Sequence, residues 1–100
     1  MTIYEITANV DKNLTDSFEK FMGERHMTEV VDTGYFESAE MTLVENGKYV
    51  IRYRCESREL LDEYLKIDAK KLRSIFSSEF PTGVEIAREI YEENDPLDAS

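Results

Sequence analysis

The stretch that decides the fold is residues 36–56, which read FESAEMTLVENGKYVIRYRCE. At its centre lies Asn46-Gly47, and this dipeptide between two alternating segments is the strongest short-range signal for a β-hairpin. On both sides of it, apolar and polar residues alternate with a period of two, which is typical of strands with one buried face. We therefore predict antiparallel strands at 36–45 and 48–56, joined by a tight turn.

Outward from the hairpin, strand-like and helix-like patterns alternate along the chain. Residues 2–10 and 84–92 show the same period of two. Residues 14–32 and 57–76 instead carry apolar side chains three and four positions apart, which is typical of amphipathic helices. The resulting order is βαββαβ, the ferredoxin-like split βαβ motif. Right-handed crossovers then place both helices on one face of a four-stranded antiparallel sheet, with the strands in the spatial order 4-1-3-2.

The helices carry local signals at their ends. Asn13 and Ser57 are residue types that favour helix N-caps, and Gly34 is suited to end the first helix. The apolar stripe of the first helix is interrupted near His26 and resumes on the opposite side. We therefore expect a kink or a change of neighbours at that point.

The predicted α+β domain spans residues 1–92, and residues 93–100 are expected to form a flexible acidic tail. One face of its sheet is left without helices. Its apolar members are Ile3, Val44, Val50 and Tyr91. Arg52 and Arg54 lie on the same face among several glutamates, and we expect these charges to neutralise one another. Pairing two such faces in a homodimer would bury the apolar residues, with the arginines meeting acidic groups across the interface.

The chain is strongly acidic. Its 12 Lys+Arg against 22 Asp+Glu give a formal net charge of −10. Nucleic acids and anionic membranes bind positive surfaces, so we expect neither as a partner. The sequence has no run of about 18 apolar residues and no signal-peptide pattern. With a single cysteine, Cys55, it is expected to be cytoplasmic.

Residues that hold metals or nucleotides are scarce. One Cys and one His cannot supply the four ligands of a closed zinc site. The four glycines are isolated and form no phosphate-binding loop. We therefore predict no metal and no cofactor. Cys55 is followed by Glu56, which disfavours a thiolate, so we interpret it as a small buried residue.

Three segments form a set of motifs, which read IYEITANVD at 3–11, HMTEVVDTGYF at 26–36 and YVIRYRCES at 49–57. In this order they resemble a small bacterial family of domains of unknown function, over residues 1 to about 92. That family is similar in pattern to dimeric α+β barrels, in which two ferredoxin-like sheets pack face to face. The larger group includes cofactor-free monooxygenases, haem-degrading enzymes, isomerases and ligand-binding proteins. The resemblance implies a homodimer with a cleft between helices and sheet, and no particular reaction.

Two positions limit what the resemblance carries over. The second helix of the family often reads His-Ala-Pro before Leu-Arg, whereas this chain has DAKKLR at 68–73. Any role of that histidine is lost or inverted here. Asn9 resembles an asparagine on the first strand of the haem-degrading members. These also rely on a tryptophan and a second-helix histidine, and this chain has neither.

Arg25, His26 and Asp68 form the first candidate site. Asp68 lies within the apolar stripe of the second helix, and Arg25 within that of the first. A charge at a core-facing position costs free energy unless it is paired, so we predict that Asp68 lies within salt-bridge reach of Arg25 or His26. In a cleft, His26 and Asp68 would be catalytic and Arg25 would bind a ligand. The alternative is an interhelix salt bridge, or side chains that extend to water.

Tyr53 and Tyr64 form the second candidate. Both are predicted to point to the interface between helices and sheet, where their hydroxyls, with Asn9, would bind a ligand. The alternative is that they are core residues with satisfied hydroxyls.

Two functions remain open. The first is a homodimeric module of the dimeric α+β-barrel type that binds a small molecule or another protein. The second is a cofactor-independent enzyme, monooxygenase- or isomerase-like, acting on a small organic substrate with His26 as acid or base. The enzyme needs a proton-transfer group with a shifted pKa in a closed cavity, whereas the module needs a groove and a dimer face. The scarcity of catalytic residue types favours the module.

Overall fold

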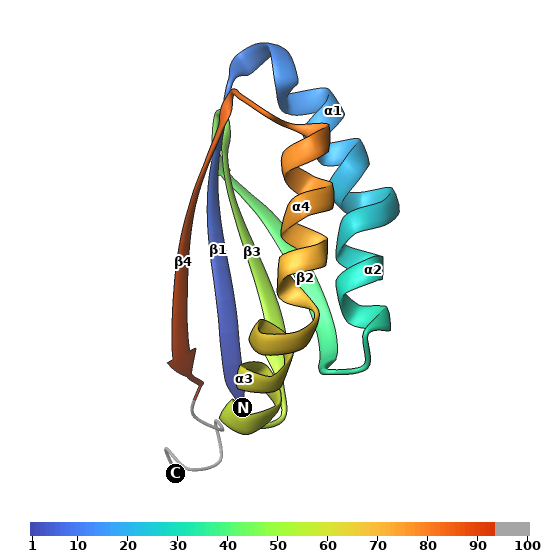
Figure 1. Cartoon of the computed structure of the whole chain (residues 1–100). Helices are drawn as coiled ribbons and strands as arrows, with labels where there is room; N and C mark the ends of the chain where they lie inside the picture. Colours follow the sequence, from blue (N-terminus) through green and yellow to red (C-terminus); the bar gives the residue numbers. More distant parts are fainter. Residues whose placement is uncertain (94–100) are drawn as a thin grey trace, which may run out of the picture.

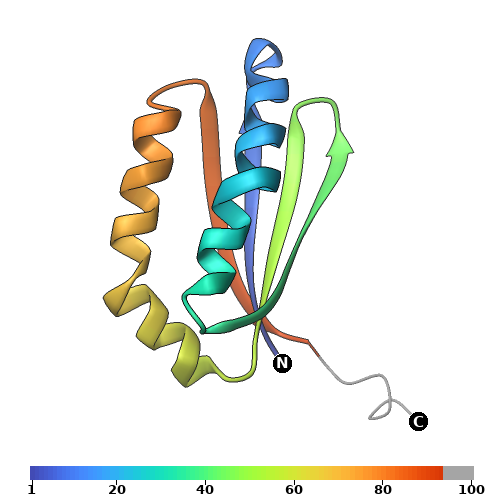
Figure 2. The same ribbon diagram turned by 90° about the vertical axis from the view of Figure 1, so that its right-hand side faces the viewer.

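Four strands form one antiparallel sheet in the computed structural model, which describes residues 1–93. The strands are β1 (Thr2–Val10), β2 (Phe36–Glu45), β3 (Lys48–Cys55) and β4 (Val84–Glu92). Their order across the sheet is β2-β3-β1-β4, which confirms the predicted topology. Figure 1 and Figure 2 show the helices together on one face of this sheet. The predicted tail at 93–100 lies outside the described residues except for Glu93.

The first helical segment connects β1 to β2. It consists of η1 (Lys12–Leu14), α1 (Thr15–Phe21), η2 (Met22–His26) and α2 (Met27–Asp32). Asn13 does not cap it, because the chain enters through a 3-10 turn in which the Leu14 N–H donates to the Asp11 carbonyl at 2.8 Å. The element η2 is a π-helical turn, which is wider than an α-helical turn. The irregularity expected near His26 falls on this turn, but Val30 beyond it is buried like Met22, so the expectation that the apolar stripe resumes on the opposite side is wrong.

The second helical segment, predicted as one helix over 57–76, is two helices. They are α3 (Arg58–Ile67) and α4 (Ala69–Glu79). Ser57 caps α3 as predicted, and its side chain accepts the Leu60 N–H at 3.3 Å. The helix breaks at Asp68, where φ is −105°, and aspartate is among the weaker helix-forming residues. No helix within residues 1–93 is long and apolar enough to cross a membrane.

Aromatic side chains fill the space between the helices and the sheet. One cluster surrounds Tyr4, whose ring centroid lies 6.2–6.4 Å from those of Phe36, Tyr53 and Tyr64. A second cluster consists of Phe18, Phe21, Phe76 and Phe80, with centroids 5.3–6.2 Å apart. These rings form a large part of the core that joins the two layers.

The sheet face without helices holds ion pairs formed within the chain. Arg54 contacts Glu40 at 3.0 Å and Glu93 at 2.6 Å. Arg52 Nη2 lies 3.7 Å from a carboxylate oxygen of Glu5. The structure thus confirms that acidic residues of the same face neutralise both arginines.

The apolar residues of this face are less exposed than the sequence predicts. Ile3 is 0% exposed and Val50 is 9% exposed, so the expectation that they face water in a single chain is wrong. Ile3 lies between Arg54 and Tyr91 in the strand register, and these long side chains flank it. Val44, at 54% exposed, is the large apolar residue that stays open.

Gly47, in the turn between β2 and β3, lies close to the backbone of β1, and a substitution there tests this close approach. Its φ is +77°, and a Cβ there would lie 2.8 Å from the Val10 carbonyl oxygen. Gly34 also has a positive φ, +92°, but a Cβ there would meet nothing within 4 Å. We expect Gly34→Ala to lower the free energy of unfolding by about 1 kcal/mol, and Gly47→Ala by about 3 kcal/mol because the clash adds to the backbone strain. Urea denaturation measures both, and equal losses would contradict the close approach.

Candidate functional site

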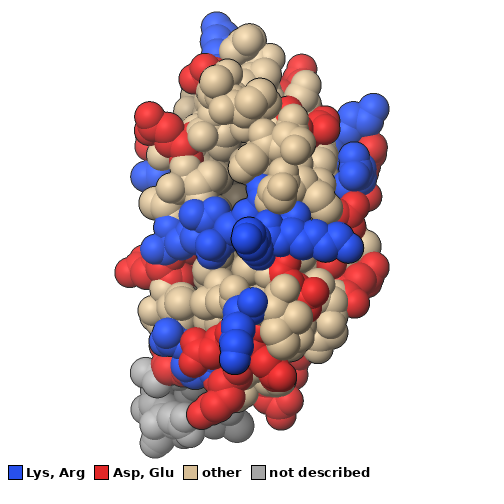
Figure 3. All heavy atoms as spheres, viewed as in Figure 1, with Lys and Arg blue, Asp and Glu red and all other residues tan. Residues whose placement is uncertain are grey.

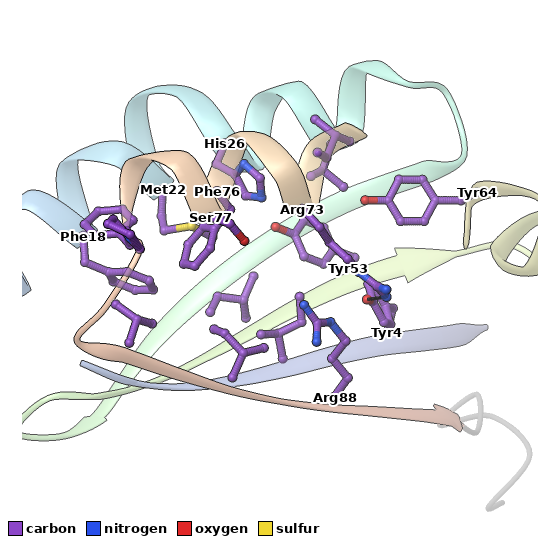
Figure 4. Close-up of a pocket in the computed structure, with 18 residues that line it drawn as sticks. Tyr4, Phe18, Met22, His26, Tyr53, Tyr64, Arg73, Phe76, Ser77 and Arg88 are labelled. Carbon is purple, nitrogen blue, oxygen red and sulfur yellow. Dashed lines mark hydrogen bonds between the residues drawn. The ribbon is translucent and has the colours of Figure 1, made fainter. Parts of the chain in front are cut away.

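A cavity of about 490 Å³ lies between the helices and the helix-covered face of the sheet (Figure 4). Sites for small molecules usually occupy about 300–1,000 Å³. The wall is mostly apolar and aromatic, and it is formed by Tyr4, Ile6, Phe18, Met22, His26, Val30, Ile51, Tyr53, Tyr64, Leu72, Phe76, Phe80, Pro81, Val84 and Ile86. The remaining lining residues, Arg73, Ser77 and Arg88, are exposed, so they lie at the opening.

His26 belongs to the π-helical turn, and Figure 4 shows its ring directed toward the cavity. The residue is 9% exposed, and its ring centroid lies 5.3 Å from that of Phe21 and 5.5 Å from that of Phe76. Nδ1 is buried and has no hydrogen-bond partner among residues 1–93. Burial lowers the pKa of His26 below 6.5; Glu29 raises it and Arg25 lowers it by smaller amounts. The imidazole is therefore neutral near pH 7, with one nitrogen as donor and the other as acceptor.

Three tyrosine hydroxyls also belong to the cavity. Tyr53 is 1% exposed, and its hydroxyl has no hydrogen-bond partner within the described chain. Tyr4 Oη accepts a hydrogen bond from Arg73 Nη2 at 3.1 Å. Burial raises the pKa of Tyr53 and of Tyr64, so both remain protonated and can donate. A buried hydroxyl without a partner costs about 1–3 kcal/mol, so Tyr53 marks a point where an acceptor atom would be stabilised.

Asp68 lies outside this cavity, at the junction of α3 and α4. Together with burial, its carboxylate raises the pKa of the Tyr35 hydroxyl beside it. Among the ion pairs of residues 1–93, none joins Asp68 to Arg25 or His26. The predicted contact is therefore wrong. The helix break is the reason, because it removes Asp68 from the continuous stripe on which the prediction relied.

Arg25 and Asn9 are not brought to the cavity either. Arg25 is exposed, its Nε lies 3.5 Å from a carboxylate oxygen of Glu29, and its guanidinium lies 5.4 Å from the centroid of the Phe21 ring. Asn9 is exposed on β1. Of the six predicted site residues, the cavity therefore unites His26, Tyr53 and Tyr64.

Arg73 and Arg88 are not among the site residues predicted from the sequence, although a signal for both is present. Arg88 lies between Ile86 and Ile90 at the inward-facing positions of β4, and Arg73 lies three residues before Phe76 on α4. Each is a charge at a position where the pattern calls for an apolar residue. Like Asp68, these two arginines are charges within an apolar pattern.

Cys55 is a small buried residue, as predicted. It is 0% exposed, and its thiol donates to the backbone carbonyls of Tyr35 at 3.1 Å and Ser57 at 3.3 Å. Burial raises the pKa of the thiol, which disfavours the reactive thiolate. Within residues 1–93, no group of three or more His, Cys, Asp or Glu side chains is placed to hold a metal ion.

The fold and the cavity define an α+β, ferredoxin-like protein with a pocket between its sheet and its helices. The chain belongs to the family described as Domain of unknown function (DUF4286), whose model matches residues 1–94. This match confirms the predicted membership of a domain-of-unknown-function family. No curated protein matches the chain.

Several solved structures share the fold at low sequence identity. A protein of unknown function from Bacteroides thetaiotaomicron has a TM-score of 0.69 at 10% identity, covering 92% of this chain and 96% of that one. An ethyl tert-butyl ether d (ethd) family protein from Bacillus halodurans gives 0.68 at 12% identity, with 94% and 100% covered. A monooxygenase from Streptomyces coelicolor, solved with the ligand nanaomycin D, gives 0.66 at 15% identity, with 94% and 89% covered. These likenesses confirm the predicted ferredoxin-like fold.

His26 is the single histidine of the sequence, so NMR can follow its titration without overlap. We expect a pKa below 6.5 in the folded protein and a value near 6.5 in urea. Because the folded-state pKa is lowered, the unfolded state binds the proton first as the pH falls through 6.5, and stability is lost from there downward. The stability difference between wild type and His26→Gln should therefore shrink from about pH 7 to about pH 5. A folded-state pKa above 6.5 would contradict the buried, neutral imidazole.

Proposed function

We propose that this protein is a homodimeric binding module for a small organic molecule, held in the cavity between sheet and helices. One observation carries the proposal. Two buried polar atoms, His26 Nδ1 and Tyr53 Oη, belong to residues that line the same cavity, and neither has a hydrogen-bond partner among the described residues. Buried polar groups in folded proteins are nearly always paired. A ligand that supplies the missing partners accounts for both atoms.

The shape and lining of the cavity favour a small molecule over a protein partner. Concave sites with apolar walls and a few polar groups bury most of the surface of a small ligand. The fold also accommodates such a ligand in a relative, since the Streptomyces coelicolor monooxygenase was solved with nanaomycin D.

The homodimer rests on the uncovered face of the sheet (Figure 1). Val44 is 54% exposed there, and Ala87 is exposed at the position that pairs with Thr7 of β1. The resemblance to dimeric α+β barrels supports pairing through this face. Arg52 and Arg54 already have acidic partners within the chain, so pairing would not leave these two charges buried and unpaired.

The setting that fits this protein is the bacterial cytoplasm. Cys55 is a free, buried thiol, which suits a reducing compartment. The formal net charge of −10 disfavours nucleic acids and anionic membranes as partners.

An enzymatic role is the second candidate, and the neutral His26 favours it. An imidazole that is unprotonated near pH 7 and faces the cavity can take a proton from a bound substrate. A binding module releases its ligand unchanged. An enzyme converts the ligand, and His26→Gln would stop the conversion while binding persists.

Two fluorescent probes test the cavity as a binding site: the anion 8-anilinonaphthalene-1-sulfonate and its neutral counterpart N-phenyl-1-naphthylamine. We expect saturable binding of at least one probe. Ser77 lines the cavity and its neighbour Ser78 does not, so Ser77→Trp should weaken binding at least about tenfold while Ser78→Trp leaves it unchanged. Circular dichroism confirms that both variants fold. Absence of saturable binding of either probe, or equal binding by folded Ser77→Trp, would contradict the proposed site.

Light scattering at micromolar concentration tests the dimer. We expect about twice the chain mass of 11.7 kDa for the wild type. Ala87→Glu places a charge on the uncovered sheet face and should yield monomers, whereas Ser78→Glu on α4 should remain dimeric. A wild-type protein that stays monomeric at high concentration would rule the dimer out.

A further inference from the structure

The arginines of this chain divide into two groups. The sequence contains six, and four of them form ion pairs: Arg25, Arg52, Arg54 and Arg58. The other two, Arg73 and Arg88, have no acidic partner among residues 1–93. These two are also the arginines that line the cavity. In a chain with ten more acidic than basic residues, the arginines without an ion pair within residues 1–93 are those at the cavity opening.

The guanidiniums of Arg73 and Arg88 lie at the same end of the cavity, although they come from different elements. Arg73 comes from α4 and Arg88 from the edge strand β4, and Figure 4 shows both near the tyrosine end of the cavity. Arg73 Nη2 lies 3.1 Å from Tyr4 Oη. Both arginines also act on the Tyr64 hydroxyl, since each lowers its pKa against the larger raising effect of burial. Their positive charges therefore combine over one group of hydroxyls.

The surface around the opening has the same sign. Figure 3 shows a band of Lys and Arg side chains that crosses the molecule between β4 and α4, with acidic side chains above and below it. A local positive patch on an acidic protein attracts an anion at short range. Guanidinium groups also match acidic groups in geometry, because they donate parallel hydrogen bonds to two oxygens.

We propose that Arg73 and Arg88 bind the acidic group of the ligand, so that the module takes an amphipathic organic anion. The apolar or aromatic body lies among the rings of the cavity, and the carboxylate, sulfonate or phosphate lies at the opening. Tyr53 Oη and His26 Nδ1 remain available for polar atoms of the body. This inference rests on the proposed function, because it names the class of ligand for the same cavity.

The matched probes test the inference, because they share one aromatic body and differ by the sulfonate. We expect wild-type protein to bind 8-anilinonaphthalene-1-sulfonate at least about tenfold more tightly than N-phenyl-1-naphthylamine. Arg73→Gln and Arg88→Gln should each weaken binding of the anion about tenfold and leave the neutral probe within about twofold. Arg88→Lys should retain part of the preference for the anion, because it keeps the charge and loses the fork. Added salt should weaken only the anion.

Arg58→Gln is the control, since it removes the same charge from an exposed arginine that is paired with Asp62 outside the cavity. It should change neither affinity. Arg73 and Arg88 are exposed, and circular dichroism with thermal melting confirms that their variants are folded. Equal affinity of wild type for the two probes, or equal loss of both probes in the arginine variants, would overturn the inference while the cavity remains a binding site. Failure of both probes to bind, or binding that Ser77→Trp leaves intact, would instead overturn the proposed function.

Discussion

The packing of large aromatic rings between sheet and helices is the constraint on which the rest of this structure depends. Tyr4 of β1 meets Tyr64 of α3 at one end, and Phe18 of α1 meets Phe76 of α4 at the other. Rings of this size hold the helices away from the sheet, and their rigid shape leaves gaps that smaller side chains must fill. On the edge strand β4, Ile86 is only partly buried, so space remains between β4 and α4. The cavity therefore follows from the same rings that make the core.

The π-helical turn decides which side chain of the first helical segment reaches that space. Besides Phe21, the buried residues of the segment recur every four positions, as Phe18, Met22, His26 and Val30. In an undistorted α-helix each step of four residues drifts by about 40° around the axis, so such a series would leave the sheet. A wider turn at Met22–His26 offsets this drift. His26 consequently faces inward, and Arg25 stays exposed.

Local patterns explain how much of this could be predicted from the sequence. The strand bounds follow from an alternation of two and from Asn46-Gly47, which depend on neighbouring residues alone. The break at Asp68 could not be predicted, because one charged residue in a long apolar stripe is compatible both with a helix break and with an acid that faces the core of a continuous helix. Its partner was then wrong, since the direction of a side chain after a helix break is set by tertiary packing. Arg88 is not predicted as a site residue because Ile86 and Ile90 on either side of it already fit the alternation of a strand. One charged residue does not change the prediction of the strand.

The charge of the chain limits what such a cavity can hold. Ten excess acidic charges produce a negative field that opposes the approach of any anion, whereas the two guanidiniums act over the short range that salt leaves unscreened, about 8 Å at physiological ionic strength. A ligand with one acidic group on an apolar body gains from the pair and presents no second charge to the field. A polyanion would place its other charges beyond Arg73 and Arg88, and the acidic residues of the chain would repel them. On our proposal, the arrangement therefore favours a single acidic group joined to an apolar body over negative charge in general.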